Sequence, residues 1–384
     1  MNFDWTDQDR AIKTRLNNVF HQTAREELDR MEEADLPELK TMTTGVLRNL
    51  APTGYLRVGF GPGARSETMH LVAAQEETAR MSGSLFLAVE VTARIFAGLL
   101  RGFGNSSRIS QIVESVENGN LIGAVAVTEP SEQGEGQRPA TEAWPDGSYY
   151  VISGRKDFVT NGPIADYLAI LANIDGRPAF CLVEQGIPGL IMGPRMKTLG
   201  YRGVAVSSLQ LNEVRVHKDL VMGPFEDRSA LVFVCLTQDM VLTMASVGLM
   251  ERTIVEAKQY SVRHQRGGKP IFAHQEIRFK LAEMLTLYQT AQLLSFRAAW
   301  MYSISDPEAE TLIHCAKVFA AERFTAARGV CSALHARRAG DLVRHHGRVP
   351  AGDVGASREG RVVSRQLCRL APVCSLLVYV FLLR

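Results

Sequence analysis

The chain has 384 residues and a formal net charge of +2, with 43 lysines and arginines against 41 aspartates and glutamates. A charge so near zero argues against nucleic acid as the main partner, because a phosphate backbone requires a strongly basic surface. The length exceeds what one hydrophobic core usually supports, so it predicts two or three domains.

The first third of the chain has helical periodicity, and we expect residues 1–119 to form an N-terminal helical domain. Thr6 can cap the first helix. The glycine-rich GFGPG at 59–63 lies between helical stretches and not after a strand, so it predicts a loop rather than a nucleotide-binding turn. Apolar residues recur at helical spacing in five stretches: 12–20, 39–50, 69–81, 85–100 and 109–119.

From Leu121 the pattern changes to short β-rich runs separated by turn signals such as PDG and NG. Several short strands at this spacing predict a sandwich or a barrel over residues 120–228. No ten-residue helical insert separates consecutive runs, which argues against a Rossmann sheet. The runs are 123–127, 149–153, 167–171, 179–183 and 208–216.

Long helical stretches return after about Ser229, at 231–265, 273–303 and 307–336. Such long apolar helices are typical of a bundle, so residues 229–384 are expected to form a C-terminal helical bundle. After about residue 336 the composition becomes atypical, because no lysine follows Lys317 while eight arginines fall between 337 and 369. This tail is either a basic extension or the product of a reading-frame change in a GC-rich gene.

The six cysteines form no Cys-x-x-Cys pair and have no histidines at zinc spacing. We therefore expect free thiols, no metal site and a cytoplasmic location. The first ten residues lack the basic and apolar regions of a secretion signal. The longest apolar run, 370–383, has 14 residues and contains Pro372, whereas a membrane-spanning helix needs about 20. No membrane association is expected.

Two segments in the middle of the chain carry a family resemblance. GAVAVTEP at 123–130 and RKDFVTNG at 155–162, about 30 residues apart, resemble the two flavin-contacting segments of the FAD-dependent acyl-CoA dehydrogenases. LGYRGVAVSSLQLNEVRV at 199–216 is similar to the strand pair that follows them, and 263–284 to the R-x-x-F-G…Q segment. The resemblance covers about residues 1–335. It implies an α+β multidomain fold with a helical N-terminal domain, a middle β-barrel and a C-terminal helical bundle.

The resemblance implies that Val127, Thr128 and Thr160 contact FAD, with Thr160 near the flavin N5 that receives hydride. Phe158 stands where the family usually has a tryptophan beside the flavin ring. The residue types agree, since a flat amphipathic ring needs hydrogen-bonding groups at its edge and an apolar wall on its face. The alternative is half-buried strand threonines and a core phenylalanine.

Other cofactor positions depart from the family pattern. Gln133 and Gly134 lie in the expected phosphate-binding segment, where Gly134 replaces a serine that would bond the cofactor. Backbone N–H groups there can still bind a diphosphate. Gly267 replaces a phenylalanine, and the Q-x-x-G-G motif is not recognisable at 333–339.

Arg263 and Gln275 match the segment by which one subunit of the family reaches a neighbour's FAD. The resemblance therefore implies a homo-oligomer, either a tetramer or a dimer.

The implied reaction needs a carboxylate base. An α-proton leaves an acyl thioester while hydride passes from the β-carbon to flavin, and the base must lie in an apolar pocket that raises its pKa. The family places this base at either of two positions. One is Gln238 here, an amide that cannot act as a base, with Asp239 beside it. The other corresponds to Glu359, whose alternative role is a solvated acid among arginines.

We interpret the chain as an oxidoreductase that dehydrogenates an acyl thioester at its α,β-bond with FAD. The acyl carrier is CoA or a carrier protein. The resemblance implies an electron-transfer flavoprotein or a similar acceptor as partner. The alternative is a catalytically impaired structural subunit of a mixed oligomer, which would fold normally but lack flavin.

Overall fold

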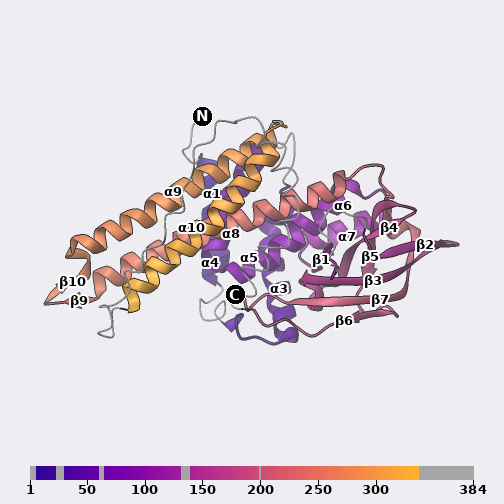
Figure 1. Ribbon diagram of the computed structural model, residues 1–384, viewed down its shortest axis with the longest axis horizontal. Helices are drawn as coiled ribbons and strands as arrows, with labels where there is room; N and C mark the ends of the chain where they lie inside the picture. Colours follow the sequence, from indigo (N-terminus) through magenta and orange to yellow (C-terminus); the bar gives the residue numbers. More distant parts are fainter. Residues whose placement is uncertain (1–5, 23–29, 60–64, 131–138, 199, 337–384) are drawn as a thin grey trace, which may run out of the picture.

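A computed structural model describes residues 6–22, 30–59, 65–130, 139–198 and 200–336. Along the chain, a helical part is followed by a β-sheet and then by a second helical part. In space the sheet forms one end of the molecule (Figure 1). The predicted order of helical, β and helical parts is therefore confirmed. Three predicted site residues, Gln133, Gly134 and Glu359, lie outside the described residues, as does the tail after 336.

The N-terminal helices begin at capping residues that the sequence supplies. Asp35 accepts a hydrogen bond from the Glu38 N–H at 2.9 Å at the start of α3, and Ser106 accepts one from the Ile109 N–H at 3.2 Å at the start of α7. The first helix starts directly after Thr6, as predicted. The elements are α1 Asp7–Gln22, α3 Leu36–Leu50, the 3-10 turns η1 Ala51–Thr53 and η2 Tyr55–Arg57, α4 Arg65–Met81, α5 Gly83–Glu90, the π-helical η3 Val91–Phe96, α6 Ala97–Phe103 and α7 Ser107–Glu117.

The middle part is one mostly antiparallel sheet in the order β6-β7-β3-β2-β4-β5-β8, and β1 pairs in parallel with β4. The predicted β-rich domain is confirmed, but closure into a barrel is not shown. The pairings among the described strands leave the three-residue β6 and the two-residue β8 at the ends of the path. The strands are β1 Gly123–Ala126, β2 Glu142–Asp146, β3 Tyr149–Thr160, β4 Tyr167–Ile174, β5 Arg177–Glu184, β6 Leu190–Met192, β7 Val206–His217 and β8 Val221–Met222.

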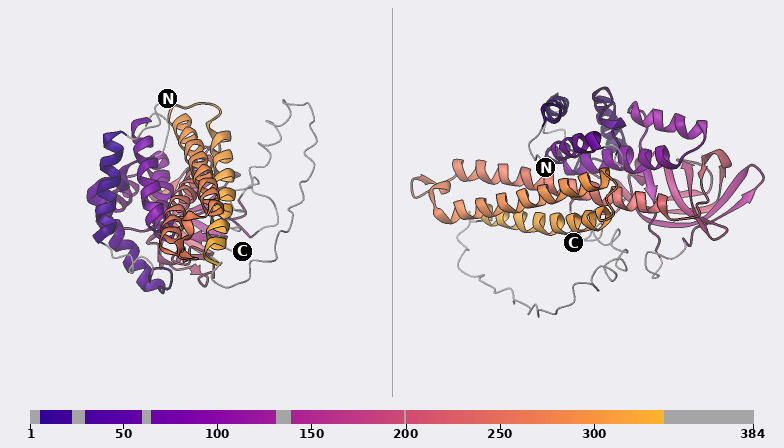
Figure 2. Two further views of the ribbon diagram at one scale, coloured as in Figure 1. Left: turned by 90° about the vertical axis from the view of Figure 1, so that its left-hand side faces the viewer. Right: turned by 90° about the horizontal axis from the view of Figure 1, so that it is seen from above.

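Three long helices, α8 Ser229–Arg263, α9 Gln275–Ser303 and α10 Ala309–Ala336, lie side by side and extend away from the sheet (Figures 1 and 2). Their bounds agree with the predicted helical stretches to within a few residues. The small hairpin of β9 Gln265–Arg266 and β10 Lys269–Pro270, followed by the 3-10 turn η6 Ile271–Ala273, joins α8 to α9 at the far end of the bundle. We call this end the bundle tip.

Helix α8 connects the sheet to the bundle, because successive parts of it belong to different hydrophobic cores. Its first residues, Ala230 and Val234, pack with the sheet and with α6 and α7. Leu236 and Met240 pack instead with the N-terminal helices and with α9 and α10. The domain boundary predicted at 228 thus falls directly before a helix whose residues belong to more than one core. The domain bounds stay a prediction.

A close approach of α8 to α4 depends on Gly248. A Cβ atom at this position would lie 2.6 Å from both the Ala79 Cβ and the Glu76 carbonyl oxygen.

Two helical segments, Gly83–Phe103 and Ser229–Arg263, are long and apolar enough to cross a membrane by length and composition. Their most apolar windows are 94% and 67% buried inside the protein, as in core helices.

Candidate flavin site

The two motif segments lie next to each other at one end of the sheet. The Asp157 N–H donates to the Thr128 carbonyl oxygen at 2.9 Å. The Lys156 ammonium donates to the Val127 carbonyl oxygen at 3.2 Å. These contacts join the residues that follow β1 to the second half of β3, so the structure brings both predicted flavin-contacting segments together.

Phe158 and Thr160 are on the side of β3 that faces the helices. The pairing of β3 with β7 is irregular between Lys156 and Val159, and Phe158 has a positive φ of 55°. Such a bulge changes the direction of a side chain and often marks a functional site. The half-buried Phe158 packs against the core that contains Leu236 of α8. Thr160 pairs with Val206, which belongs to the same core.

Asn161 fixes the end of β3 to the helical part. It follows Thr160 with a φ of 63°, and its side-chain amide donates to the Ala88 carbonyl oxygen at 2.8 Å. The same amide lies 3.3 Å from the Thr92 hydroxyl, which itself accepts from the Gly123 N–H. Thr92 belongs to the π-helical segment η3, an irregularity that is frequent at functional sites. The start of β1 and the end of β3 are thus held against one helix.

The described side chains fit a flavin ring. Val127, Thr128, Phe158 and Thr160 are all half-buried, so a ligand can reach them without unfolding the sheet. Two hydroxyl groups and one aromatic face at one end of the sheet supply the polar edge and the apolar wall that the ring requires. The roles of these four residues stay predictions.

Asp239 lies in a buried ionic cluster between α8 and α10. Its Oδ1 is 2.6 Å from the Lys317 Nζ, and its Oδ2 is 2.7 Å from the His314 Nδ1. The Asp239 and Lys317 side chains are 2% and 3% exposed, whereas His314 is 44% exposed. Both carboxylate oxygens are therefore engaged by α10. The sequence predicted Asp239 as a candidate base without either partner, and its catalytic role stays a prediction.

Arg263 and Gln275 lie at the bundle tip and are exposed. Leu236, on the same helix as Arg263, belongs to the core that Phe158 contacts and that contains Val206, the partner of Thr160. An α-helix rises about 1.5 Å per residue, so Leu236 and Arg263 are roughly 40 Å apart along the helix axis. Arg263 therefore lies far from Thr160 within one copy of the chain, and the contact of either residue with a flavin stays a prediction.

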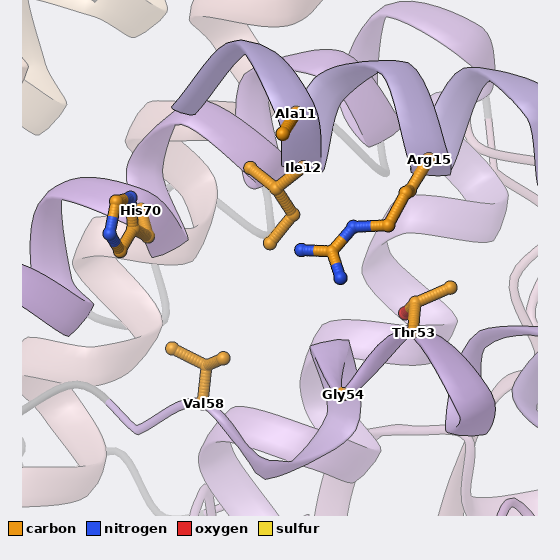
Figure 3. A pocket seen from close by; sticks show the side chains of 7 residues that line it. All are labelled: Ala11, Ile12, Arg15, Thr53, Gly54, Val58 and His70. Carbon is orange, nitrogen blue, oxygen red and sulfur yellow. The ribbon is translucent and has the colours of Figure 1, made fainter. Parts of the chain in front are cut away.

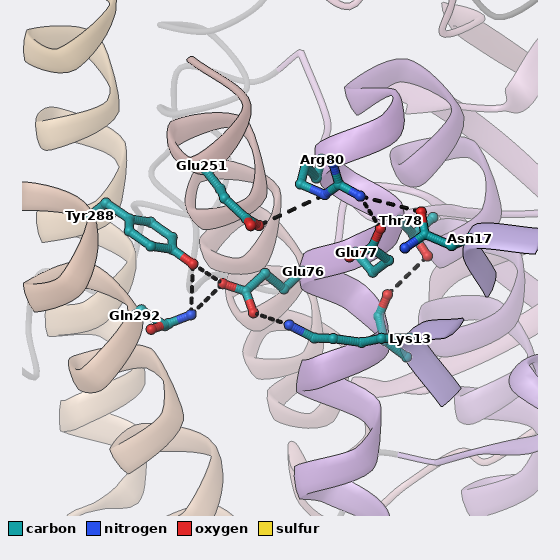
Figure 4. A network of polar contacts seen from close by, with 10 residues as sticks. Lys13, Asn17, Glu76, Glu77, Thr78, Arg80, Glu251, Tyr288 and Gln292 are labelled. Atoms are coloured by element: carbon teal, nitrogen blue, oxygen red, sulfur yellow. Dashed lines mark hydrogen bonds and ion pairs between the residues drawn. The ribbon is translucent and has the colours of Figure 1, made fainter. Parts of the chain in front are cut away.

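A buried polar network joins α1, α4, α8 and α9 (Figure 4). Glu76 accepts hydrogen bonds from Lys13 at 2.8 Å and from the Tyr288 hydroxyl at 2.7 Å. Burial and then the charge of Glu76 raise the pKa of Glu251 to about 7. No local pattern in the sequence indicates this network, because the partners come from four helices far apart in the chain. The other members are Asn17, Glu77, Arg80 and Gln292.

A cavity of about 590 Å³ lies among α1, the η1–η2 turns and α4 (Figure 3). The Arg15 guanidinium points into it beside the side chain of Ile12, and Val58 lies across the cavity. No residue that the sequence predicted for the flavin site lines this cavity.

Among the described residues, no group of three or more His, Cys, Asp or Glu side chains could hold a metal ion.

Two family models match the chain in succession. Residues 124–214 match the acyl-CoA dehydrogenase middle domain, and residues 239–344 match the acyl-CoA dehydrogenase C-terminal domain. The first match contains Thr128, Phe158 and Thr160 of the two motif segments. The second contains Asp239, Arg263 and Gln275.

Known proteins agree with this assignment. Benzylmalonyl-CoA dehydrogenase of Aromatoleum aromaticum is 28% identical over 338 residues, which cover 86% of this chain and 87% of the relative. Cyclohexane-1-carbonyl-CoA dehydrogenase of Geobacter metallireducens is 32% identical over 250 residues, covering 63% of this chain and 65% of that protein. The fold matches butyryl-CoA dehydrogenase of Megasphaera elsdenii with a TM-score of 0.75 at 20% identity, over 87% of this chain and 89% of that one.

The two motif segments, the order of the elements and the two family models agree with one another. They confirm the family and the cofactor that the motifs predicted. The chain belongs to the acyl-CoA dehydrogenase family of FAD-dependent oxidoreductases.

Proposed function

We propose that this protein dehydrogenates the α,β-bond of an acyl thioester with FAD. The observation that carries the proposal is the junction of the two motif segments, with Phe158 turned toward the helical core and Thr128 and Thr160 half-buried beside it. The two relatives named above are dehydrogenases of CoA thioesters, one with a benzylmalonyl and one with a cyclohexanecarbonyl group. We therefore propose CoA as the acyl carrier, and a carrier protein as the alternative.

In this proposal, bound FAD supplies the hydride acceptor, and the chain positions it. The Thr128 and Thr160 hydroxyls donate hydrogen bonds to the polar edge of the ring, and Phe158 covers one face. Asn161 keeps the end of β3 against α5 and η3, so that Thr160 keeps its position relative to the helices. Fixed donors of this kind stabilise developing charge more effectively than mobile water does.

Glu359 and Asp239 remain the candidate bases. A general base needs an oxygen that can reach the substrate proton within hydrogen-bond distance. Both oxygens of Asp239 are engaged by Lys317 and His314. This geometry favours Glu359 over Asp239.

Anaerobic mixing with acyl-CoA thioesters tests the proposed reaction. We expect at least one thioester from a panel of straight-chain, cyclic and aromatic acyl groups to bleach the flavin absorption band. Loss of a general base costs about 10²–10⁴-fold in rate, so Glu359→Gln is expected to slow bleaching by that amount. Glu322→Gln, which removes an exposed carboxylate of α10, serves as the control. A folded protein that binds no flavin would support the structural-subunit alternative instead.

We further propose that two copies of the chain complete each flavin site, within a dimer or a tetramer. The bundle carries large apolar side chains that are exposed in a single copy, as an oligomer interface requires. They include Val255, Val262, Phe272, Phe279, Leu285 and Leu293. We also propose that an electron-transfer flavoprotein or a similar acceptor is the redox partner. The proposed location is cytoplasmic.

Sedimentation and FAD titration test the shared site. We expect a dimer or a tetramer, and about tenfold weaker FAD binding in Gln275→Ala, because a buried ligand group loses one hydrogen-bonding partner. Gln111→Ala, at an exposed position of α7 and outside the bundle, is the control and should bind FAD normally. A monomer with full flavin occupancy would contradict the shared site.

A further inference from the structure

Glu129 joins three segments of the sheet through one carboxylate. Its Oε1 accepts from the Lys156 Nζ at 2.6 Å, from the Thr141 N–H at 2.9 Å and from the Thr141 hydroxyl at 2.7 Å. Its Oε2 accepts from the Ala140 N–H at 2.6 Å. The residues after β1, the residues before β2 and the middle of β3 therefore meet at this side chain.

The other half of the pair is buried more deeply. The Lys156 side chain is fully buried, and that of Glu129 is 12% exposed. Besides Glu129, Lys156 donates to the Val127 carbonyl oxygen, one residue before Thr128. Thr141 in turn packs against Gly154 of β3, where a Cβ atom would lie 2.5 Å from the threonine hydroxyl. No part of this junction can move without moving β3.

Both members of the pair are charged at neutral pH. Burial lowers the pKa of Lys156 to about 8, and the charge and hydrogen bond of Glu129, followed by the Cys181 thiol of β5, limit the shift. Burial raises the pKa of that thiol to about 12, so Cys181 stays neutral over the range in which Lys156 titrates. Burial alone would raise the pKa of Glu129, but the Lys156 charge and the hydrogen bonds from Lys156, Thr141 and Ala140 outweigh it and lower the pKa. A buried ion pair with its hydrogen bonds satisfied holds its geometry well, whereas the loss of one partner leaves a costly lone charge.

The pair lies between the predicted flavin contacts without being one of them. Thr128 directly precedes Glu129, and Phe158 comes two residues after Lys156. The fully buried Lys156 has no surface with which to touch a ring. We propose that Glu129 and Lys156 are positioning residues, which fix the spacing between Thr128 on one segment and Phe158 and Thr160 on the other. This inference rests on the proposed flavin-dependent function.

Three variants test the pair. Glu129→Gln keeps the shape but removes the charge, Lys156→Met removes the cation, and the double variant removes both without leaving a lone charge. Asp146→Asn is the matched control, because Asp146 forms a 2.6 Å ion pair with Arg215 on the same sheet, with side chains about half exposed. Each protein is titrated with FAD between pH 6 and 9, and amide hydrogen exchange of residues 139–146 is measured without FAD.

We expect Glu129→Gln to bind FAD about tenfold more weakly and Asp146→Asn to bind it normally. FAD binding by the unmodified protein should weaken above about pH 8, as Lys156 loses its proton, and Lys156→Met should lose this dependence. The double variant should regain thermal stability but not FAD affinity, an outcome that a purely structural pair would not produce. In flavin-free Glu129→Gln, the amides of Ala140 and Thr141 should exchange faster.

Three results would each overturn the inference alone. They are unchanged FAD affinity in Glu129→Gln, equal losses in Glu129→Gln and Asp146→Asn, and unchanged amide exchange at Ala140 and Thr141. If the unmodified protein binds no FAD at all, the proposed function fails together with the inference, so the two failures are distinguished by the first titration.

Discussion

Replacing Lys317 with methionine is expected to destabilise the protein by about 3 kcal/mol, because it removes the buried cation from one oxygen of the Asp239 carboxylate and leaves the half-exposed His314 ring on the other. The two side chains are 2.6 Å apart and at most 3% exposed, so water cannot replace the ammonium group. Chemical denaturation of the flavin-free protein measures the effect. The midpoint should fall while the slope of the unfolding free energy stays the same.

Two further variants separate burial from pairing. Lys40→Met breaks the ion pair with Asp166, which has a similar length of 2.7 Å but side chains that are 45% and 34% exposed. An exposed pair contributes at most about 1 kcal/mol, so this variant should lose little. The double variant Asp239→Leu, Lys317→Met should recover most of the stability that Lys317→Met loses. Equal losses in Lys317→Met and Lys40→Met would contradict the explanation.

The ionisation of Glu251 is expected to lower the free energy of unfolding by about 3 kcal/mol as the pH rises from 4.5 to above 7. The size of the effect follows from the pKa shift, since one pKa unit corresponds to about 1.4 kcal/mol. Burial, followed by the charge of Glu76, raises the pKa of this carboxyl from 4.5 to about 7. Below pH 4.5 the carboxyl is protonated in both states and its contribution is fully present. Between the two values only the unfolded chain ionises, so stability is lost as the pH rises.

Burial is the main reason that the pKa of Glu251 is raised, and the surrounding charges act in the same direction on balance. From α4 it faces Glu76, Glu77 and Arg80, and from α1 it faces Lys13. On α9 the Tyr288 hydroxyl donates to Glu76, so it adds no positive charge. Three carboxylates thus face two cations, and one proton is retained.

Glu251→Gln removes the ionisation while keeping the size of the side chain. This variant should be more stable than the unmodified protein at pH 8 and should lose this part of the pH dependence. Glu256→Gln is the control, since Glu256 lies on the same helix and is exposed in its pair with Arg252. Denaturation curves of the flavin-free proteins at pH 5, 6, 7 and 8 measure both variants. A parallel decline of Glu251→Gln and the unmodified protein would rule out Glu251 as the cause.

Local patterns were sufficient to predict the helices. The apolar spacing at 231–265 and 273–303 corresponds to α8 and α9 within two residues at each end. Such spacing depends only on neighbours along the chain. Strand β3 was predicted over 149–153 but extends to Thr160. Its second half was missed because charged residues and a bulge interrupt the alternation of apolar and polar residues there.

The buried ion pairs could not be predicted in the same way. Asp239 and Lys317 lie on different helices, so no periodicity connects them. The motifs did predict that the segments of Thr128 and Thr160 are adjacent. They did not reveal that Glu129 and Lys156 join those segments, because glutamate and lysine side chains are usually exposed to solvent.

The π-helical segment Val91–Phe96 contains about one residue more than an α-helix would use to join α5 to α6, since the Ala97 N–H donates to the carbonyl oxygen of Thr92, five residues before it. Deletion of one residue there would restore α-helical hydrogen bonding and leave Leu99 and Leu100 in the core that they share with the sheet. The same deletion at Ala97 or Gly98 of α6 would instead turn the residues that follow by about 100°. Single-residue deletions should therefore be better tolerated in the π-helical segment than in α6.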